Sequence, residues 1–332
     1  MSQQVKTVDI SALTEADGSA RRAAERALGE AAEEMGFLCI TGAPVAAVTA
    51  QARIAELLRI FELPEEEKHR LMNRKNVPEH DNAYRGYFGL QRGDSARTSE
   101  GYDMGSDAGP HGAADWIEEL LMEPNVWPRA ELLPGWRESA TAHYREMEAL
   151  GRLLMRSLGR YLGVGSDYFE PYFGEASTLR FLRALPRPDL TPDKVDEPRY
   201  RTVIDGKDVR LHTPAHRDSG VMTLLWQPGG LQAQNPKGDW VPAPKLASAL
   251  NVNFGDCLEF WTGGRLGATA HRVLAQDSDR YSIPFFFEPR CDARIAPLPG
   301  LPEAPPIRYA DHVFEKMKLF GTHATDRKET AA

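Results

Sequence analysis

The sequence has few cysteines, no long apolar run and no excess of positive charge. Its three cysteines, Cys39, Cys257 and Cys291, are widely spaced and odd in number, which excludes a disulfide scaffold and fits a reducing compartment. No CxxC pair or Cys/His cluster indicates structural zinc. No stretch approaches the roughly 20 apolar residues that span a bilayer, and the polar start lacks the pattern of a signal peptide. We therefore expect a cytoplasmic protein with no membrane partner.

The balance of charge also excludes a class of partner. Lys and Arg number 40 against 48 Asp and Glu, which leaves a net charge of −8. General binding to nucleic acid needs a basic surface, so we expect small-molecule partners instead. The sequence shows no internal repeat and no alternation of strand and helix, which argues against a doubly wound nucleotide fold. Nothing in it indicates the oligomeric state.

The first half of the chain has helical periodicity. Apolar residues at spacings of three and four predict helices over 19–35, 46–61 and 137–162. An acidic first turn after Pro64 predicts another short helix. Residues 37–40 are a continuous apolar run that predicts a buried strand. Residues 80–115 are rich in Gly, Asp and Ser without a period, so we expect a long irregular connection there.

The pattern changes after about residue 178. Short apolar or alternating runs follow one another, separated by Gly, Pro, Asn and Asp. The runs are 221–226, 250–254, 257–262, 271–275 and 280–288. Many short strands with turn signals between them predict an antiparallel sandwich or barrel.

Three residues of this region form a candidate metal site. Side chains at i and i+2 of a strand point to the same face, so His216 and Asp218 can meet one ion, and His271 can close the set from another strand. Two imidazoles and a carboxylate are the facial triad of non-haem iron oxygenases. Hydrolytic zinc sites use the same ligand types, and a plain hydrogen-bonded cluster is the structural alternative. His212 is another possible ligand, but Pro214 separates it from the triplet and favours a structural role.

A second candidate site lies in the last apolar run. Arg280 and Ser282 share one face of the predicted strand. A guanidinium and a hydroxyl together suit a carboxylate. The neighbouring residues are strongly apolar, and a buried arginine needs an anionic partner, which a bound carboxylate can supply.

Several short motifs follow one another along the chain. In the second half they are 216–225 (HRDSGVMTLL), 253–256 (NFGD), 261–264 (WTGG), 271–273 (HRV) and 280–287 (RYSIPFFF). In the first half they are 36–38 (GFL), 41–42 (TG), 63–64 (LP), 67–68 (EK), 84–87 (YRGY), 100–103 (EGYD) and 127–128 (WP). In these motifs and their order the chain resembles the isopenicillin N synthase-like family of 2-oxoglutarate- and Fe(II)-dependent oxygenases. The resemblance covers roughly residues 6 to 290, and ordered motifs are far more specific than one triplet.

The resemblance implies a mixed α/β fold with a mainly antiparallel core. That core is a double-stranded β-helix, or jelly roll of the cupin kind, braced by helices from the first half. We expect one compact catalytic unit in four parts. These are an N-terminal helix and strand region over 6–130, a bracing helix over 131–176, the jelly-roll core over 177–290 and a C-terminal extension over 291–332.

The resemblance also implies the chemistry. His216, Asp218 and His271 would bind Fe(II), and Arg280 with Ser282 would bind the distal carboxylate of the co-substrate 2-oxoglutarate. With dioxygen, the enzyme would couple oxidative decarboxylation of 2-oxoglutarate, to succinate and carbon dioxide, to C–H oxidation of a small substrate. The outcome would be hydroxylation, desaturation or ring closure. An amino acid or a secondary metabolite is the substrate suggested by analogy.

One departure from the family leaves an alternative open. Many relatives carry a Tyr just before the Pro that ends the strand near residue 180, and this chain has none there. Either Arg183 makes the second contact to 2-oxoglutarate, or the enzyme is an oxidase like isopenicillin N synthase that uses no 2-oxoglutarate. A zinc hydrolase and a non-catalytic binding jelly roll are further alternatives. For the main substrate we expect contacts from Arg85, Arg183 and Phe287, although Arg85 is more simply read as a brace of its loop.

Overall fold

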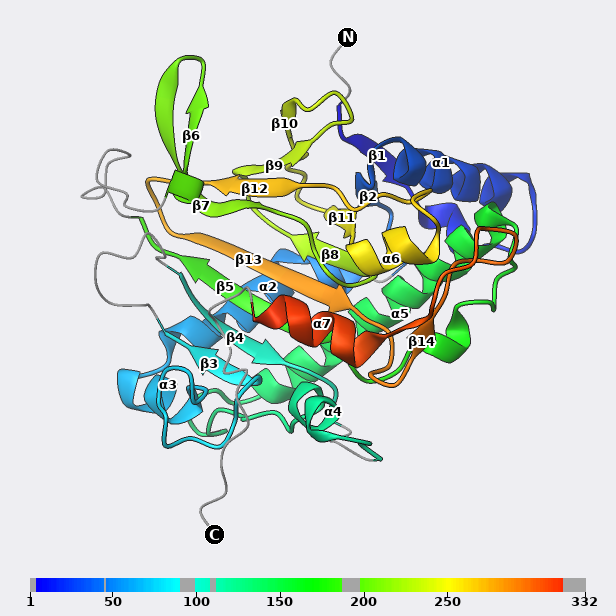
Figure 1. Ribbon diagram of the computed structural model, residues 1–332. Coiled ribbons are helices and arrows are strands. Elements are labelled where there is room, and N and C mark those ends of the chain that lie inside the picture. The colour runs from blue at the N-terminus through cyan, green and yellow to red at the C-terminus, as the bar shows by residue number, and fades with distance from the viewer. Residues whose placement is uncertain (1–3, 45, 90–98, 108–111, 187–197, 319–332) are drawn as a thin grey trace.

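Two β-sheets face each other, and helices cover the outside of the larger one (Figure 1). The computed structural model describes residues 4–44, 46–89, 99–107, 112–186 and 198–318. The helices of these ranges are α1 (Ser19–Met35), α2 (Gln51–Leu58), α3 (Glu65–Leu71), α4 (Trp116–Leu121), α5 (Trp136–Leu162), α6 (Asp256–Trp261) and α7 (Tyr309–Met317).

The larger sheet has eight strands in the order β1-β2-β11-β8-β13-β5-β4-β3 and the smaller has five in the order β10-β9-β12-β7-β6. The larger contains β1 (Lys6–Asp9), β2 (Phe37–Thr41), β3 (Gly86–Phe88), β4 (Ser99–Met104), β5 (Thr178–Ala184), β8 (Met222–Trp226), β11 (Leu250–Phe254) and β13 (Arg280–Phe287). The smaller contains β6 (Arg201–Ile204), β7 (Lys207–His216), β9 (Leu231–Gln234), β10 (Trp240–Pro242) and β12 (His271–Leu274). A separate pair joins β14 (Arg294–Ile295) to β15 (Ile307–Arg308). Two facing, mainly antiparallel sheets confirm the expected jelly roll.

Helix α5 braces the outer face of the larger sheet. Its apolar residues recur at helical spacing and face β13, where the rings of Tyr144 and Phe285 lie 5.2 Å apart. Gly163 ends the helix in the left-handed conformation, with φ of 81°, which glycine adopts without a Cβ clash. Helix α1 lies beside α5 on the same side of the molecule (Figure 1). The periodicity correctly predicted both helices, within one residue at each end.

Three local expectations are wrong. Residues 257–262 are not a strand, because α6 runs over Asp256–Trp261 and buries Cys257, Leu258 and Trp261 at helical spacing. A short apolar run does not distinguish strand from helix, so only its packing decides. Strand β7 ends at His216, and Asp218 lies just beyond it. The segment 80–115 is not wholly irregular, since β3 and β4 lie within it and extend the larger sheet.

The C-terminal helix α7 docks against the loop that follows β7. Nε2 of His312 lies 2.9 Å from the carbonyl oxygen of Ser219 and 2.8 Å from Oδ1 of Asp256. Lys316 donates to the same Asp256 carboxylate at 2.6 Å. These contacts hold α7 over one end of the jelly roll. Among the described helices, none has both the length and the apolar character needed to cross a bilayer.

Candidate metal centre

The two histidines face each other across neighbouring strands of the smaller sheet. His216 is the last residue of β7, His271 is the first of β12, and the two are directly paired in the register. Their ring centroids are 4.2 Å apart. Nδ1 of His216 lies 2.9 Å from the Pro214 carbonyl, and Nδ1 of His271 lies 3.1 Å from the Thr269 carbonyl. If each Nδ1–H donates to its carbonyl, both Nε2 atoms are left to bind a metal.

Asp218 completes the triad from the loop after β7. Its Oδ1 lies 3.6 Å from Nε2 of His216 and 3.6 Å from Nε2 of His271. Its Oδ2 accepts hydrogen bonds from Thr223 Oγ1 at 2.5 Å and from Asn253 Nδ2 at 2.7 Å. No described residue donates a hydrogen bond to Oδ1. One carboxylate oxygen is therefore fixed by the larger sheet, and the other faces the two imidazoles.

The protonation states suit a cation. Burial by itself raises the pKa of Asp218, but His271, His216 and the hydrogen bonds from Thr223 and Asn253 outweigh it, so the net pKa is lowered. Burial, and then the neighbouring His216, lower the pKa of His271 to about 4. Asp218 is thus charged and His271 neutral at pH 7, which are the forms that bind metal. The ligand atoms of the three residues lie within 4.8 Å of one another, so one ion can contact all three.

The amide of Asn253 orients the Asp218 carboxylate, and its loss should weaken metal binding. We expect Asn253→Leu to lower the affinity for Fe(II) by about 10- to 100-fold, the usual effect of removing such a supporting hydrogen bond. Asn251 is two residues earlier in β11, on the same face, and its Nδ2 donates to the Pro244 carbonyl instead. Asn251→Leu should therefore leave the affinity nearly unchanged. Anaerobic titration with Fe(II) measures both, and equal losses would contradict the role given to Asn253.

Arg280 and Ser282 lie inside the jelly roll on β13. Both side chains are buried, and Arg280 Nη1 donates to Ser282 Oγ at 3.2 Å while its Nε donates to the Gly229 carbonyl at 2.8 Å. Burial lowers the pKa of Arg280 to about 10, so the guanidinium stays charged at pH 7. No carboxylate of the described residues pairs with it. A buried cation without an anion is the feature expected of a site for a carboxylate ligand.

Two predicted contact residues have partners elsewhere. Arg183 binds the carboxylates of Asp279, at 2.6 Å, and Glu100, at 3.1 Å. It pairs with Tyr281 in the register, so it lies on the opposite face of the sheet from Arg280 and Ser282. This position argues against Arg183 as the second contact to the Arg280 site.

Arg85 acts as an internal brace. It is almost fully buried, and its guanidinium donates to Thr178 Oγ1 at 2.7 Å and to the Leu121 carbonyl at 3.0 Å. These contacts tie the segment before β3 to β5 and to α4. They favour the structural reading of this residue over a substrate contact.

Phe287 faces away from the metal centre. Its ring packs 4.3 Å from that of Phe173, and a Cβ on Gly151 of α5 would lie 2.5 Å from it. The expectation that Phe287 contacts substrate is therefore not supported. Side chains alternate along β13, and it is Phe286 that lines the cavity beside the triad.

That cavity is lined by residues for which the sequence analysis predicted no role. It has a volume of about 140 Å³ and opens onto His216 and Asp218. Its other walls come from the loop after Asp218, the segment before β3, strands β5 and β13, and α7. They are Tyr84, Arg180, Ser219, Gly220, Phe286, Glu288, Val313 and Met317. No local pattern marks these residues, because five separate segments meet only in the folded chain.

Glu288 stands out in this cavity because burial, as the main cause, raises its pKa from 4.5 to about 8. Between these values the folded protein holds a proton that the unfolded chain releases, so this group makes stability fall as pH rises from about 4.5 to 8. We expect Glu288→Gln, which stays neutral, to avoid that loss. The variant should match wild type near pH 4.5 and exceed it by on the order of 3 kcal/mol at pH 8.

Urea unfolding of both proteins over this pH range measures the difference in their free energies of unfolding. The contributions of the other titrating groups are the same in both proteins and cancel in this difference. A constant difference between pH 4.5 and pH 8 would show that the Glu288 carboxyl titrates normally.

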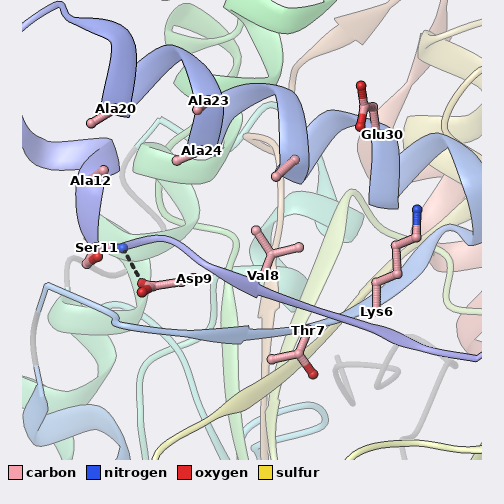
Figure 2. A pocket seen from close by; sticks show the side chains of 11 residues that line it. Lys6, Thr7, Val8, Asp9, Ser11, Ala12, Ala20, Ala23, Ala24 and Glu30 are labelled. Atoms are coloured by element: carbon pink, nitrogen blue, oxygen red, sulfur yellow. Dashed lines mark hydrogen bonds between the residues drawn. The ribbon is translucent and has the colours of Figure 1, made fainter.

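A wider groove lies between β1 and α1 and has a volume of about 520 Å³ (Figure 2). Its floor is Val8 and its wall is a row of alanines on α1, including Ala20, Ala23 and Ala24. The backbone nitrogen of Ser11 donates to Asp9 at its end, 2.9 Å away. The groove contains no histidine or cysteine, so we assign it no catalytic role.

A jelly roll with two histidines and one carboxylate at the end of its smaller sheet is typical of the class of mononuclear non-haem metal oxygenases. Comparison with known proteins makes the assignment specific. The model of the 2OG-Fe(II) oxygenase superfamily matches residues 193–289, and that of the non-haem dioxygenase in morphine synthesis N-terminal region matches residues 5–130. The chain belongs to the 2-oxoglutarate- and Fe(II)-dependent oxygenase family.

Similar proteins agree in both sequence and fold. The 2-oxoglutarate-dependent dioxygenase citB of Monascus ruber is 30% identical over 305 residues, covering 88% of this chain and 86% of that protein. Isopenicillin N synthase of Streptomyces jumonjinensis is 27% identical, covering 90% and 88%. The structure of Neurospora crassa T7H with alpha-KG and thymine superposes with a TM-score of 0.78 at 21% identity, covering 95% and 96%. The protein is thus an enzyme whose cofactors are Fe(II) and 2-oxoglutarate and whose substrate is a small molecule.

Proposed function

We propose that His216, Asp218 and His271 bind Fe(II), and that Arg280 with Ser282 binds the distal carboxylate of 2-oxoglutarate. The observation that carries the proposal is the approach of two imidazoles and one carboxylate oxygen inside the jelly roll, with Oδ1 of Asp218 3.6 Å from each Nε2. The buried charge of Arg280 supplies the second half of the site. A zinc hydrolase offers no reason for that buried cation.

Each part of the site has a physical task. When bound, iron and 2-oxoglutarate supply with dioxygen the oxidising power that ends in succinate, carbon dioxide and an oxidised C–H bond. Thr223 and Asn253 hold the Asp218 carboxylate in one orientation. The main substrate lies in the cavity beside His216, where Phe286, Val313 and Met317 keep water from the reacting atoms.

Anaerobic addition of Fe(II) and 2-oxoglutarate tests the proposal. We expect a weak visible charge-transfer band that needs both additions, followed by succinate release when oxygen and a substrate are supplied. A protein that retains iron but forms no band and no succinate would instead support the oxidase alternative. Hydrolytic activity that needs zinc and no oxygen would overturn the proposal altogether.

The domain limits and the location are part of the same proposal. The division into 6–130, 131–176, 177–290 and 291–332 as one catalytic unit is supported by β1 to β4, which share a sheet with the core strands, and by α7, which lines the cavity. Its test is limited proteolysis, which should release no stable fragment. A cytoplasmic location is supported by the three unpaired cysteines, and cell fractionation checks it.

A further inference from the structure

The cavity beside the triad is sized for a single ring. Its volume is about 140 Å³, and an engineered cavity of about 150 Å³ in another protein binds benzene. The ring of Phe286 and the side chains of Val313 and Met317 give it apolar walls. The reacting part of the substrate therefore fits as one compact group lying against the metal centre.

Glu288 supplies a polar group to this cavity. Its Oε2 accepts a hydrogen bond from the Tyr309 hydroxyl of α7 and another from the Val221 backbone nitrogen at 3.3 Å. No described residue donates to its Oε1. The carboxyl lies against Gly220, where even a Cβ would come within 2.0 Å of Oε2. It is a deeply buried group with one oxygen left for a ligand.

No positive charge balances Glu288. None of the described lysines, arginines or histidines forms an ion pair or hydrogen bond with it, and its hydrogen-bond donors are a phenol and a backbone amide. A buried carboxylate without a counter-ion is strongly unfavourable, so the group is held as the neutral acid. Its raised pKa agrees. A neutral acid offers one donor and one acceptor rather than a charge.

The positive charge of Arg180, in the cavity wall, is already neutralised by a carboxylate. Arg180 makes two hydrogen bonds of 2.7 Å to the fully buried carboxylate of Asp103. Its guanidinium carbon also lies 5.5 Å from the centre of the Phe286 ring. A substrate carboxylate at this point would have to compete with Asp103, which the sheet holds in place.

The metal centre adds no excess positive charge. This step rests on the proposed function, in which Fe(II) and Arg280 meet the negative charges of Asp218 and of the 2-oxoglutarate dianion. Two positive charges from Fe(II) and one from Arg280 balance one negative charge from Asp218 and two from 2-oxoglutarate, so the net charge of the site is zero. An anionic substrate would thus enter an electrically balanced site and lose its hydration without finding a partner.

We infer that the cavity takes an uncharged, ring-sized group that hydrogen-bonds to the Glu288 carboxyl. An amide, a lactam, a ketone or an alcohol satisfies this requirement, and a carboxylate or an ammonium does not. Glu288 is then the residue that selects substrates by charge. The inference narrows the substrate class and disfavours an amino acid, whose two charges have no partners here.

Three probes of nearly equal size test the inference: benzamide, benzoate and benzylammonium. Their affinities are measured by ligand-observed NMR on the protein with Fe(II) and 2-oxoglutarate under nitrogen, and again on the metal-free protein. We expect benzamide to bind at least about tenfold more tightly than either charged probe, as a hydrogen bond plus the avoided burial of a charge predicts. Benzoate or benzylammonium binding as tightly as benzamide overturns the inference, and so does the absence of binding by all three.

Variants show whether the probes occupy this cavity. Val313→Trp fills it and should abolish benzamide binding, while iron and 2-oxoglutarate are retained. Glu288→Leu should weaken benzamide binding by about tenfold, and Glu288→Gln, which keeps a donor and an acceptor, should stay within about threefold of wild type. Unchanged binding in Val313→Trp or in Glu288→Leu would overturn the inference. Failure to bind iron would overturn the proposed function alone, because the metal-free measurement still decides the preference.

Discussion

His216→Ala will lose its iron and with it all oxidation. In the proposed site His216 supplies one of three protein ligands, and its Nε2 faces Oδ1 of Asp218, the oxygen that would bind the same ion. Two remaining ligands do not hold Fe(II) against dilution. Iron content should fall from about one per chain to near zero, and 2-oxoglutarate decarboxylation should fall to that of a metal-free control.

The same variant should still fold. His216 is the last residue of its strand, and its side chain is 25% exposed, so little of the apolar core depends on it. We expect the free energy of unfolding of the metal-free protein to change by less than about 1 kcal/mol. Circular dichroism and urea unfolding measure this, and global unfolding would instead point to a structural histidine cluster.

His212→Ala is the matched control. His212 lies four residues earlier on β7, and its Nδ1 contacts Thr213 Oγ1 at 3.1 Å. It is the other histidine that the sequence offers as a ligand. We expect this variant to retain iron at the wild-type level. Loss of iron from His212→Ala together with its retention in His216→Ala would mean that the ligand set is wrong.

The spacing of residues in the sequence, with the family resemblance, indicated which three side chains could form the triad, and the structure brings these three together in a different way than the spacing predicted. Asp218 does not share a strand with His216. Its orientation comes instead from Thr223 and Asn253, which lie on two neighbouring strands of the other sheet. Only the register of β8 against β11 brings these two side chains to one carboxylate, and a single sequence does not contain that register.

The lining of the proposed substrate cavity could not be predicted from the sequence for the same reason. The alternation of Phe285, Phe286 and Phe287 shows that one set faces inward, but the choice depends on which face α5 covers. Glu288 follows the motif strand without a pattern of its own. Its neutral state comes from burial, and the Tyr309 hydroxyl that donates to it reaches it from α7, outside the residues that resemble the family. The proposed specificity therefore depends on long-range packing, which local sequence patterns do not contain.

Arg280→Gln should be the variant that separates co-substrate binding from metal binding. The Arg280 guanidinium is buried and has no carboxylate partner among the described residues, so in the proposed site 2-oxoglutarate provides its counter-ion. Removing one member of a buried, hydrogen-bonded charge pair costs about 2–5 kcal/mol, or roughly 30- to several-thousand-fold in Kd. Anaerobic titration of the iron-loaded variant with 2-oxoglutarate, followed by the charge-transfer band, measures the loss.

Arg183→Gln is the control for this prediction, and it also tests the alternative that Arg183 replaces the missing Tyr. Arg183 lies on the neighbouring strand β5, but its carboxylate partners are Asp279 and Glu100. We expect the 2-oxoglutarate affinity of this variant to stay within about threefold of wild type, because Arg183 lies on the opposite face of the sheet from Arg280 and Ser282. Both variants should hold iron, since neither residue contacts the triad. If Arg183→Gln loses 2-oxoglutarate and Arg280→Gln keeps it, the co-substrate enters from the other face of the sheet, and the assignment of the Arg280 and Ser282 pair is wrong.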